Sequence, residues 1–347
     1  MTRTPGTLHV LTETYRPVGG VVKIMDYVLH ALDAGYDISI RCREKFKPGL
    51  PLFAVERFAP LVDDERVTFH RKKLLKVMEN DLVFLSLPAS YELAYRSLPR
   101  GYSPERLIHI IQNVRHTNPT WRDGQPVRLL TRPLARISIN DIVADEIAPW
   151  LDPRTVHAVI PIGHDVDYFA KRRTGGLTGG EKRPLRVGHT TWKSEVGDRT
   201  AALLAGEEIE FRAIRDVATW ADLRDLYHWS DVFLSTPGPQ EGLYLPGVEA
   251  MAAGALVVTS DAGGNMQYCR PDQNCLLVAM EDEHDYARAL QQVRSMPVAE
   301  VESLRAGGHA ATEMFSMERE RKLFQDYLEA LWPRIEAYEA GHASTLA

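Results

Sequence analysis

The chain has little cysteine. Its 347 residues include only Cys42, Cys269 and Cys275. An odd and sparse set excludes the disulfide framework of a small secreted domain. No further ligands lie near Cys269 and Cys275 to complete a zinc site. We therefore expect three small buried thiols and no metal.

Long apolar runs are absent too. No stretch approaches the roughly 20 apolar residues that a transmembrane helix needs. The first residues hold a short, strand-like apolar run where a secretory signal would have a longer core, so a cytoplasmic protein is expected. No Gly-x-Gly-x-x-Gly pattern follows the first strand of either half, which argues against a dinucleotide oxidoreductase.

The net charge of -6 argues against general nucleic-acid binding. The charge is uneven, because residues 1–150 carry a small basic excess and the rest is acidic. A basic half could face an anionic acceptor or a membrane surface, and an ordinary solvated surface explains it equally well. The basic run at residues 71–76 leaves a similar choice between weak peripheral membrane contact and a solvated face, which we favour.

Strands and helices alternate along the chain, which predicts the α/β class with a doubly wound sheet. The apolar run Leu8–Leu11 is followed by a Gly/Pro turn, and apolar residues then recur at helical spacing as far as Gly35. The run Ile38–Ile40 comes next, so a βαβ unit with parallel strands is expected. Further strands are predicted at Leu82–Leu85, Leu107–Ile111, Ile137–Ile139 and Val156–Ile160.

The composition changes after residue 170. The next segment is rich in glycine and charge and has no apolar periodicity, which indicates a linker. A second α/β series then starts at Leu185, so two Rossmann-like domains facing each other across a cleft are predicted. The expected parts are an N-terminal, acceptor-side domain over residues 1–170, a linker over 171–184, a C-terminal, nucleotide-sugar-binding domain over 185–316, and a C-terminal helix over 317–347 whose return to the first domain is left open.

The most informative stretch reads EGLYLPGVEAMAAGALVV and begins at Glu241. Gly242 and Gly247 let backbone N–H groups approach a ligand closely. A helix N-terminus beside them is suited to a phosphate. Glu241 and Glu249 would repel the phosphate but can accept hydrogen bonds from hydroxyl groups. A ligand with hydroxyl groups on both sides of a diphosphate is a nucleotide sugar.

This stretch resembles the Glu–seven–Glu signature of family 4 glycosyltransferases, which are retaining enzymes of the GT-B fold and of the glycosyl transferases group 1 type. The signature is usually written E-G-F-G-L-P-x-x-E-A-M-A-x-G-x-P-V-V. The resemblance implies that Glu241 contacts the donor sugar and that Glu249 binds the ribose hydroxyls. It also implies that the backbone of Gly242, Leu243 and Tyr244 approaches the sugar and diphosphate. Since Leu243-Tyr244 replaces Phe-Gly, a bulkier side chain is expected near the donor sugar.

Two further segments resemble the same family. The passage IPIGHDVDYF at Ile160–Phe169 is similar to P-N-G-V-D-x-x-x-F, which closes the first domain in the family. Asp165 and Asp167 are therefore assigned to a loop and not to a D-x-D metal site. The turn before the first helix resembles the family's opening, which implies that Gly19 and Gly20 approach the donor diphosphate or the acceptor. A simple tight turn is the alternative.

The sequence departs from the family at the phosphate clamp. The family places Arg and Lys early in the second domain, after a strand that ends in Gly. Here Gly188 is that glycine, and His189 stands where the Arg is expected. A histidine is a weaker phosphate clamp than the fixed fork of an arginine. Lys193 is the nearest candidate for the Lys, with Arg199 as a second choice.

The family also suggests a histidine after a strand of the first domain, facing the reacting centre. His109 alternates with apolar neighbours inside a strand and is predicted to be structural. His116 follows at the carboxyl end of that strand, where ligands bind in open α/β sheets. We favour His116 as the catalytic histidine, and an ordinary loop histidine is the alternative.

Together these features predict a hexosyltransferase that moves a sugar from a nucleoside diphosphate to an unidentified hydroxyl acceptor. By resemblance, the reaction retains configuration and needs no metal or other cofactor. Glu241, His116 and Lys193 are the expected catalytic residues, and His189 and Gly188 are included in the donor site. Two other functions on the same fold stay open, a nucleotide-sugar 2-epimerase and a non-catalytic relative that binds a nucleotide sugar or glycan.

Overall fold

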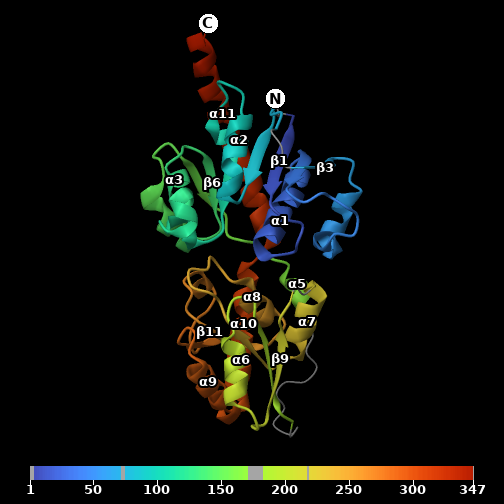
Figure 1. Cartoon of the computed structure of the whole chain (residues 1–347), viewed down its shortest axis with the longest axis vertical. Coiled ribbons are helices and arrows are strands. Elements are labelled where there is room, and N and C mark those ends of the chain that lie inside the picture. The colour runs from blue at the N-terminus through green and yellow to red at the C-terminus, as the bar shows by residue number, and fades with distance from the viewer. Residues whose placement is uncertain (1–3, 72–74, 171–182, 217–218, 347) are drawn as a thin grey trace. The chain divides into compact units, whose positions relative to one another are not determined.

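The computed structural model describes residues 4–71, 75–170, 183–216 and 219–346, and side chains of the last helix only as far as residue 342. The chain forms two compact units (Figure 1). Unit 1 comprises residues 1–162 and 317–347, and unit 2 comprises residues 163–316. Residues 163–170, which the sequence analysis placed in the first domain, thus belong to unit 2. Most of the predicted linker and the centre of the basic run (residues 171–182 and 72–74) lie outside the described residues.

Unit 1 is built on a sheet that, over the described residues, has seven strands in the order β3-β2-β1-β4-β5-β6-β7. Every pairing is parallel. The strand order reverses between β1 and β4, which is the topological switch point of this sheet. The strands are β1 Thr7–Thr12, β2 Asp37–Cys42, β3 Val67–Arg71, β4 Leu82–Leu85, β5 Leu107–Ile111, β6 Ala135–Ser138 and β7 Val156–Val159.

The central strands of unit 1 are mostly apolar because they are covered on both faces. Every residue of β4 and of β5 is buried, as expected for strands inside a parallel sheet. These two strands match the predicted ranges. The edge strand β3 escaped prediction because most of its residues are exposed and polar. The helices of this unit are α1 Gly19–Asp33, α2 Tyr91–Ser97, α3 Gln125–Leu130, α4 Asp141–Ile147 and α11 Met317–Leu346.

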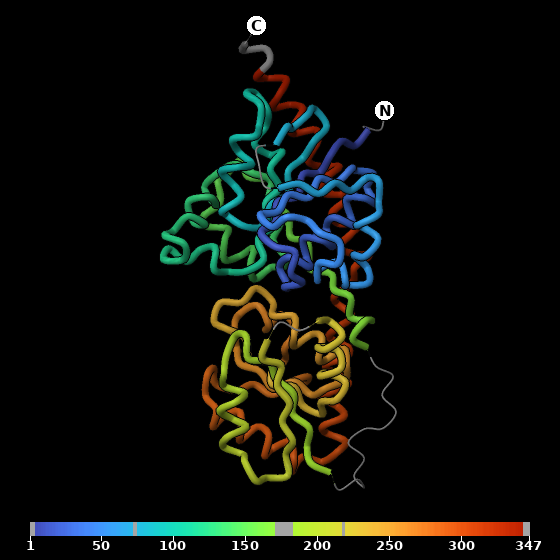
Figure 2. The backbone as a smooth tube through the Cα atoms, turned by 45° about the vertical axis from the view of Figure 1, so that its right-hand side comes forward, coloured from blue at the N-terminus to red at the C-terminus, as the bar shows by residue number. Residues whose placement is uncertain are grey.

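The C-terminal helix α11 belongs to the core of unit 1, so both chain termini lie in this unit (Figure 2). It packs against α1, where the rings of Tyr27 and Phe324 meet edge to face at 4.8 Å between centroids. The buried carboxylate of Glu320 also contacts Lys23 Nζ at 2.7 Å and His30 Nε2 at 3.0 Å. The helix α1 ends at Asp33, two residues before the predicted terminator Gly35, which has φ of +87°.

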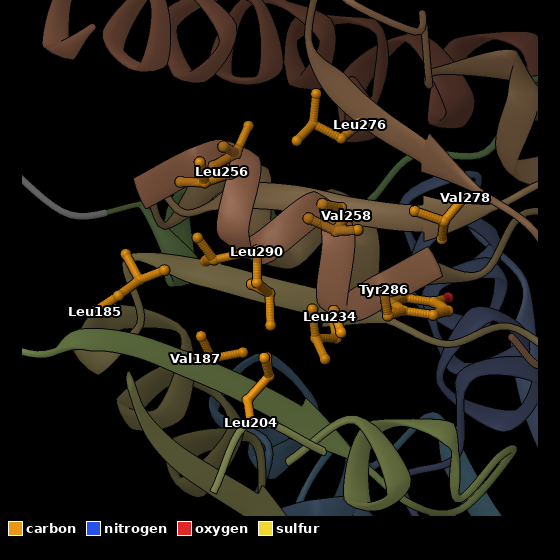
Figure 3. Packing of buried hydrophobic residues seen from close by; sticks show 14 of the residues in the cluster. Leu185, Val187, Leu204, Leu234, Leu256, Val258, Leu276, Val278, Tyr286 and Leu290 are labelled. Carbon is orange, nitrogen blue, oxygen red and sulfur yellow. The ribbon is translucent and has the colours of Figure 1, made fainter. Parts of the chain in front are cut away.

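Unit 2 has a second parallel sheet whose order, over the described residues, is β12-β11-β10-β8-β9. Its core is drawn from both strands and helices, with Val187, Leu234 and Leu290 among the converging side chains (Figure 3). The elements are β8 Leu185–Thr190, β9 Ile209–Ile214, β10 Val232–Ser235, β11 Leu256–Ser260 and β12 Cys275–Val278, with α5 Val166–Phe169, α6 Val196–Leu203, α7 Trp220–Trp229, α8 Leu245–Ala252, α9 Glu283–Ser295 and α10 Val298–Ala311.

The three cysteines are buried free thiols, as expected. In the described part of the chain, no helix combines the length and the apolar character needed to cross a membrane.

Candidate active site

The carboxyl ends of β8 and β10 mark the candidate site of unit 2. These strands are neighbours, and the path of the chain through the sheet reverses between them. In open parallel sheets, ligands bind at the carboxyl edge beside such a switch point. The loop after β8 carries Lys193, and the loop after β10 carries Glu241. The topology therefore brings two predicted site residues from distant parts of the sequence to one edge.

Lys193 and Glu241 form an ion pair there, with Nζ and Oε1 separated by 2.7 Å. The lysine side chain is 38% exposed, whereas that of the glutamate is 11% exposed. Solvent screens such a pair, so it adds little to folding stability. The pair matters for ligand binding, because it places a cation that can bind a phosphate beside a carboxylate that can bind hydroxyl groups at the switch point.

The backbone around Glu241 is fixed by the segment that follows β11. The Glu241 N–H donates to the carbonyl of Ala262 at 3.1 Å, and the Gly264 N–H donates to the Glu241 carbonyl at 3.1 Å. A Cβ on Gly264 would lie 2.0 Å from the carbonyl oxygen of Gly242. Only glycine lets the two loops approach this closely, so Gly264 controls where Glu241 stands.

The two residues that replace the family's Phe-Gly are turned inward. Leu243 and Tyr244 are buried, and burial raises the pKa of Tyr244 to about 12. Tyr244 adopts a left-handed backbone with φ of 64° just before α8. Its carbonyl accepts a hydrogen bond of 2.9 Å from the hydroxyl of Tyr268. The Tyr244 hydroxyl lies near Thr190, Thr236 and Glu241, at the carboxyl ends of β8 and β10, so a bulkier side chain near the donor sugar stays a prediction.

Glu249 is buried on α8, and both of its carboxylate oxygens are bonded. Oε1 lies 3.0 Å from Nε2 of His164, and Oε2 accepts a hydrogen bond of 2.8 Å from Tyr227. Burial and the nearby Glu249 carboxylate raise the pKa of Tyr227 well above its usual value, so the phenol stays a donor. Glu249 is thus neither free nor a solvated surface charge.

His189 is buried and does not present its ring as a phosphate clamp. Nε2 lies 2.8 Å from Oδ1 of Asp198, and a Cβ on Gly197 would come within 2.4 Å of the ring. Burial lowers the pKa of His189, which opposes a positive charge at this position. Gly188 also has a packing explanation, since a Cβ there would lie 2.2 Å from the hydroxyl of Ser230.

Arg199, the second choice for the clamp, is held elsewhere on the surface. Its guanidinium pairs with Glu281 at 2.9 Å and with Glu283 at 3.1 Å. Lys193 is therefore the better placed of the two cations, because it lies against Glu241 at the switch point.

In unit 1, Gly19 and Gly20 form the first turn of α1 beside the β1–β4 switch point. Both are exposed, and no side chain caps this helix N-terminus. The side-chain amide of Gln112, which follows β5, donates to the Gly20 carbonyl at 3.1 Å and to the Ser86 hydroxyl at 2.9 Å. The first turn of α1 therefore leaves backbone N–H groups open to a ligand.

His116 lies in the turn after β5, as predicted, but its ring is buried between His109 and Trp121. Burial lowers its pKa to about 3, with nearby arginines acting in the same direction. His109 is structural, as expected, because its Nδ1 lies 2.8 Å from the buried guanidinium of Arg136. Both histidines are therefore neutral at physiological pH.

A pocket of about 380 Å³ opens beside this turn in unit 1. Tyr91 and Leu129 lie at its apolar side, and Arg122, Arg128 and Arg132 also line it. Within the described residues, none of these three arginines has a carboxylate within ion-pairing distance, whereas many other arginines do. Glu92 and Asp123 line the pocket as well, so three guanidinium groups face two carboxylates and the positive excess is small.

Asp165 has a structural role, since its side chain accepts a 3.3 Å hydrogen bond from the backbone of Tyr168 at the start of α5. Across the ranges that the structure describes, no group of three His, Cys, Asp or Glu side chains is placed to hold a metal ion.

Two α/β units, each with a parallel sheet and its own switch point, define the chain as a GT-B fold. HepE of Anabaena, in a structure with UDP and glucose, superposes with a TM-score of 0.71 at 14% identity, over 93% of this chain and 99% of that one. Sucrose-phosphate synthase of Thermosynechococcus elongatus superposes with a TM-score of 0.69 at 12% identity, over 95% of this chain and 100% of that one. A glycosyltransferase of Rickettsia africae superposes with a TM-score of 0.62 at 15% identity, over 95% of this chain and 99% of that one.

Residues 186–295, which lie within unit 2, match the family model described as Glycosyl transferases group 1. The matched range contains Lys193, Glu241 and Glu249. Both the resemblance inferred from the motif and the predicted GT-B fold class are confirmed. A comparison with curated proteins finds no match.

The sequence analysis missed two residues that contact Glu249, His164 and Tyr227. One signal was present, because His164 stands where the family's P-N-G-V-D passage has Val. Tyr227 gives no such signal, since a tyrosine at an apolar position of an amphipathic helix is indistinguishable from an ordinary core residue.

Proposed function

We propose that the protein transfers a sugar from a nucleoside diphosphate donor to a hydroxyl acceptor with retention of anomeric configuration. The observation that carries this proposal is the Lys193–Glu241 pair at the unit 2 switch point, ahead of the N-terminus of α8. The group 1 family match covers the same residues. UDP is the first nucleotide to test, because HepE structures contain UDP and UDP-glucose.

Donor binding would replace the internal pair by contacts with the ligand. Lys193 would turn from Glu241 to the diphosphate, and Glu241 would accept hydrogen bonds from sugar hydroxyl groups. In the reaction, the bond from the anomeric carbon to the phosphate oxygen breaks, the acceptor oxygen bonds to that carbon on the same face, and the acceptor proton passes to the departing phosphate. Negative charge grows on that phosphate, so Lys193 and the N–H groups at the start of α8 stabilise the transition state. No step requires a metal ion.

We assign the acceptor to unit 1, near Gly19, Gly20 and the turn that holds His116. A neutral, buried His116 is unsuited to carry positive charge, so its part is positioning. The three arginines of the nearby pocket outnumber its two carboxylates, Glu92 and Asp123, so the pocket suits an acceptor with a negatively charged group. A combined Arg128→Gln and Arg132→Gln variant should raise the KM of such an acceptor about tenfold, as expected when one to two hydrogen bonds to a charged group are lost. Donor affinity should stay unchanged.

The direct test is titration calorimetry with UDP, GDP, ADP and dTDP and their sugar derivatives, followed by turnover with an acceptor panel. Binding of one nucleotide series, weakened by Glu241→Gln, supports the donor site. Transfer that gives product with the donor's anomeric configuration in proton NMR supports the full proposal. An inverted product refutes retention. Isomerisation of the sugar without an acceptor would indicate an epimerase, and binding without turnover would indicate a non-catalytic relative.

A further inference from the structure

The carboxylate of Glu249 is held from two sides inside unit 2. A carboxylate only accepts hydrogen bonds, so Nε2 of His164 carries the hydrogen in the 3.0 Å contact, and Tyr227 donates the 2.8 Å bond from the other side. Each carboxylate oxygen has a second acceptor site. Glu249 can therefore keep both internal bonds and still accept hydrogen bonds from two ligand hydroxyl groups.

His164 itself has no freedom to move its ring. The ring stacks on Phe169 at 5.7 Å between centroids and lies against Trp220 at 5.5 Å. Its backbone N–H donates to the carbonyl of Phe315 at 3.1 Å. The side chain is fully buried. The direction from which Nε2 meets Glu249 is therefore fixed by packing.

Packing alone does not explain a histidine here. Nδ1 of His164 is buried without a hydrogen-bond partner among the described residues, which is unfavourable relative to a satisfied group. The family passage has Val at this position, and a valine side chain has no polar atom to leave unpaired. What the histidine adds is the bond to Glu249.

We propose that His164 is a positioning residue for the donor: together with Tyr227 it fixes the Glu249 carboxylate so that its remaining acceptor sites meet the 2′- and 3′-hydroxyl groups of the nucleotide ribose. This inference rests on the proposed function, because it assumes that a nucleoside diphosphate binds at unit 2. It concerns a residue at which this chain departs from the family pattern.

The test compares UDP with 2′,3′-dideoxy-UDP by titration calorimetry on wild type, His164→Val and His164→Gln; if wild type prefers another base, that base replaces uracil in both ligands. His164→Val should weaken UDP binding about tenfold, comparable to one lost hydrogen bond to a charged group. The dideoxy analogue should bind wild type and His164→Val almost equally, because it lacks the hydroxyl groups that Glu249 would contact. In His164→Gln the side-chain amide can donate in place of Nε2, so most UDP affinity should return.

Two further variants separate positioning from stability. Tyr227→Phe removes the second bond to Glu249 and should also weaken UDP more than the dideoxy analogue. His228→Val is the matched control, because that histidine of unit 2 bonds to the Phe169 carbonyl at 2.8 Å instead. It should lower the melting temperature while leaving the UDP-to-dideoxy ratio unchanged.

Distinct results overturn the inference and the proposed function. If wild type binds UDP and His164→Val binds it equally well, or loses the same factor for both ligands, His164 does not position Glu249. The same conclusion follows if folded His164→Gln shows no recovery. If wild type binds no nucleoside diphosphate at all, the proposed function fails, and the inference falls with it.

Discussion

Replacing Gly264 by alanine tests whether the position of Glu241 controls the reaction. A Cβ at residue 264 would lie 2.0 Å from the Gly242 carbonyl oxygen, whereas real Cβ contacts keep at least 3.0 Å. The loop carrying Glu241 must therefore retreat by about 1 Å. A displacement of that size at a reacting centre costs about 100-fold in rate. Overpacking of this kind destabilises by about 1–3 kcal/mol, so the variant should fold.

Gly263→Ala is the matched control for this prediction. Gly263 has φ of +83°, which strains an alanine, but a Cβ there meets nothing within 4 Å. The control should lower the melting temperature while leaving the rate of sugar transfer within a few-fold of wild type. Both variants should be followed by thermal unfolding and by steady-state turnover. The reasoning is refuted if Gly264→Ala retains full activity, or if Gly263→Ala loses as much.

Three other changes give separate predictions. Glu320→Gln should destabilise unit 1 by about 1–3 kcal/mol in urea unfolding, because the buried ammonium of Lys23 loses one charged partner and keeps Asp26 at 2.9 Å. An unchanged midpoint would contradict this. Lys193→Met should weaken UDP at least tenfold in calorimetry, whereas Arg199→Met should not, and equal losses would show a general charge effect. His116→Gln should reduce the loss of stability that wild type shows between pH 6.5 and pH 3. In this range the unfolded chain binds a proton at His116, whereas the folded chain, in which the pKa of His116 is about 3, does not. Wild type therefore loses up to about 1.4 kcal/mol of stability per pH unit through this residue on acidification. Urea titrations at pH 7 and pH 5 check the difference in slope, and identical slopes would contradict the assignment.

Most buried strands were predictable from the sequence because a strand inside a parallel sheet is apolar at most positions. Leu82–Leu85 and Leu107–Ile111 are examples. The strands β9 and β12 in unit 2 were not predicted. β9 lies at a sheet edge and alternates with charged residues, and β12 is short and partly exposed. Edge strands carry a weaker apolar signal, since one side faces solvent.

The sequence by itself determined the family motif and the α/β class, and it left the cation for the donor phosphate open between Lys193 and Arg199. Those conclusions follow from local spacing, which is a property of the chain alone. The tertiary structure favours Lys193, since packing brings its Nζ to 2.7 Å from Oε1 of Glu241 and pairs Arg199 with other carboxylates. It also determined the hydrogen bonds of Glu249, because its partners His164 and Tyr227 lie 85 and 22 residues away in the chain. Contacts over such separations depend on how whole elements pack, and no local pattern records them.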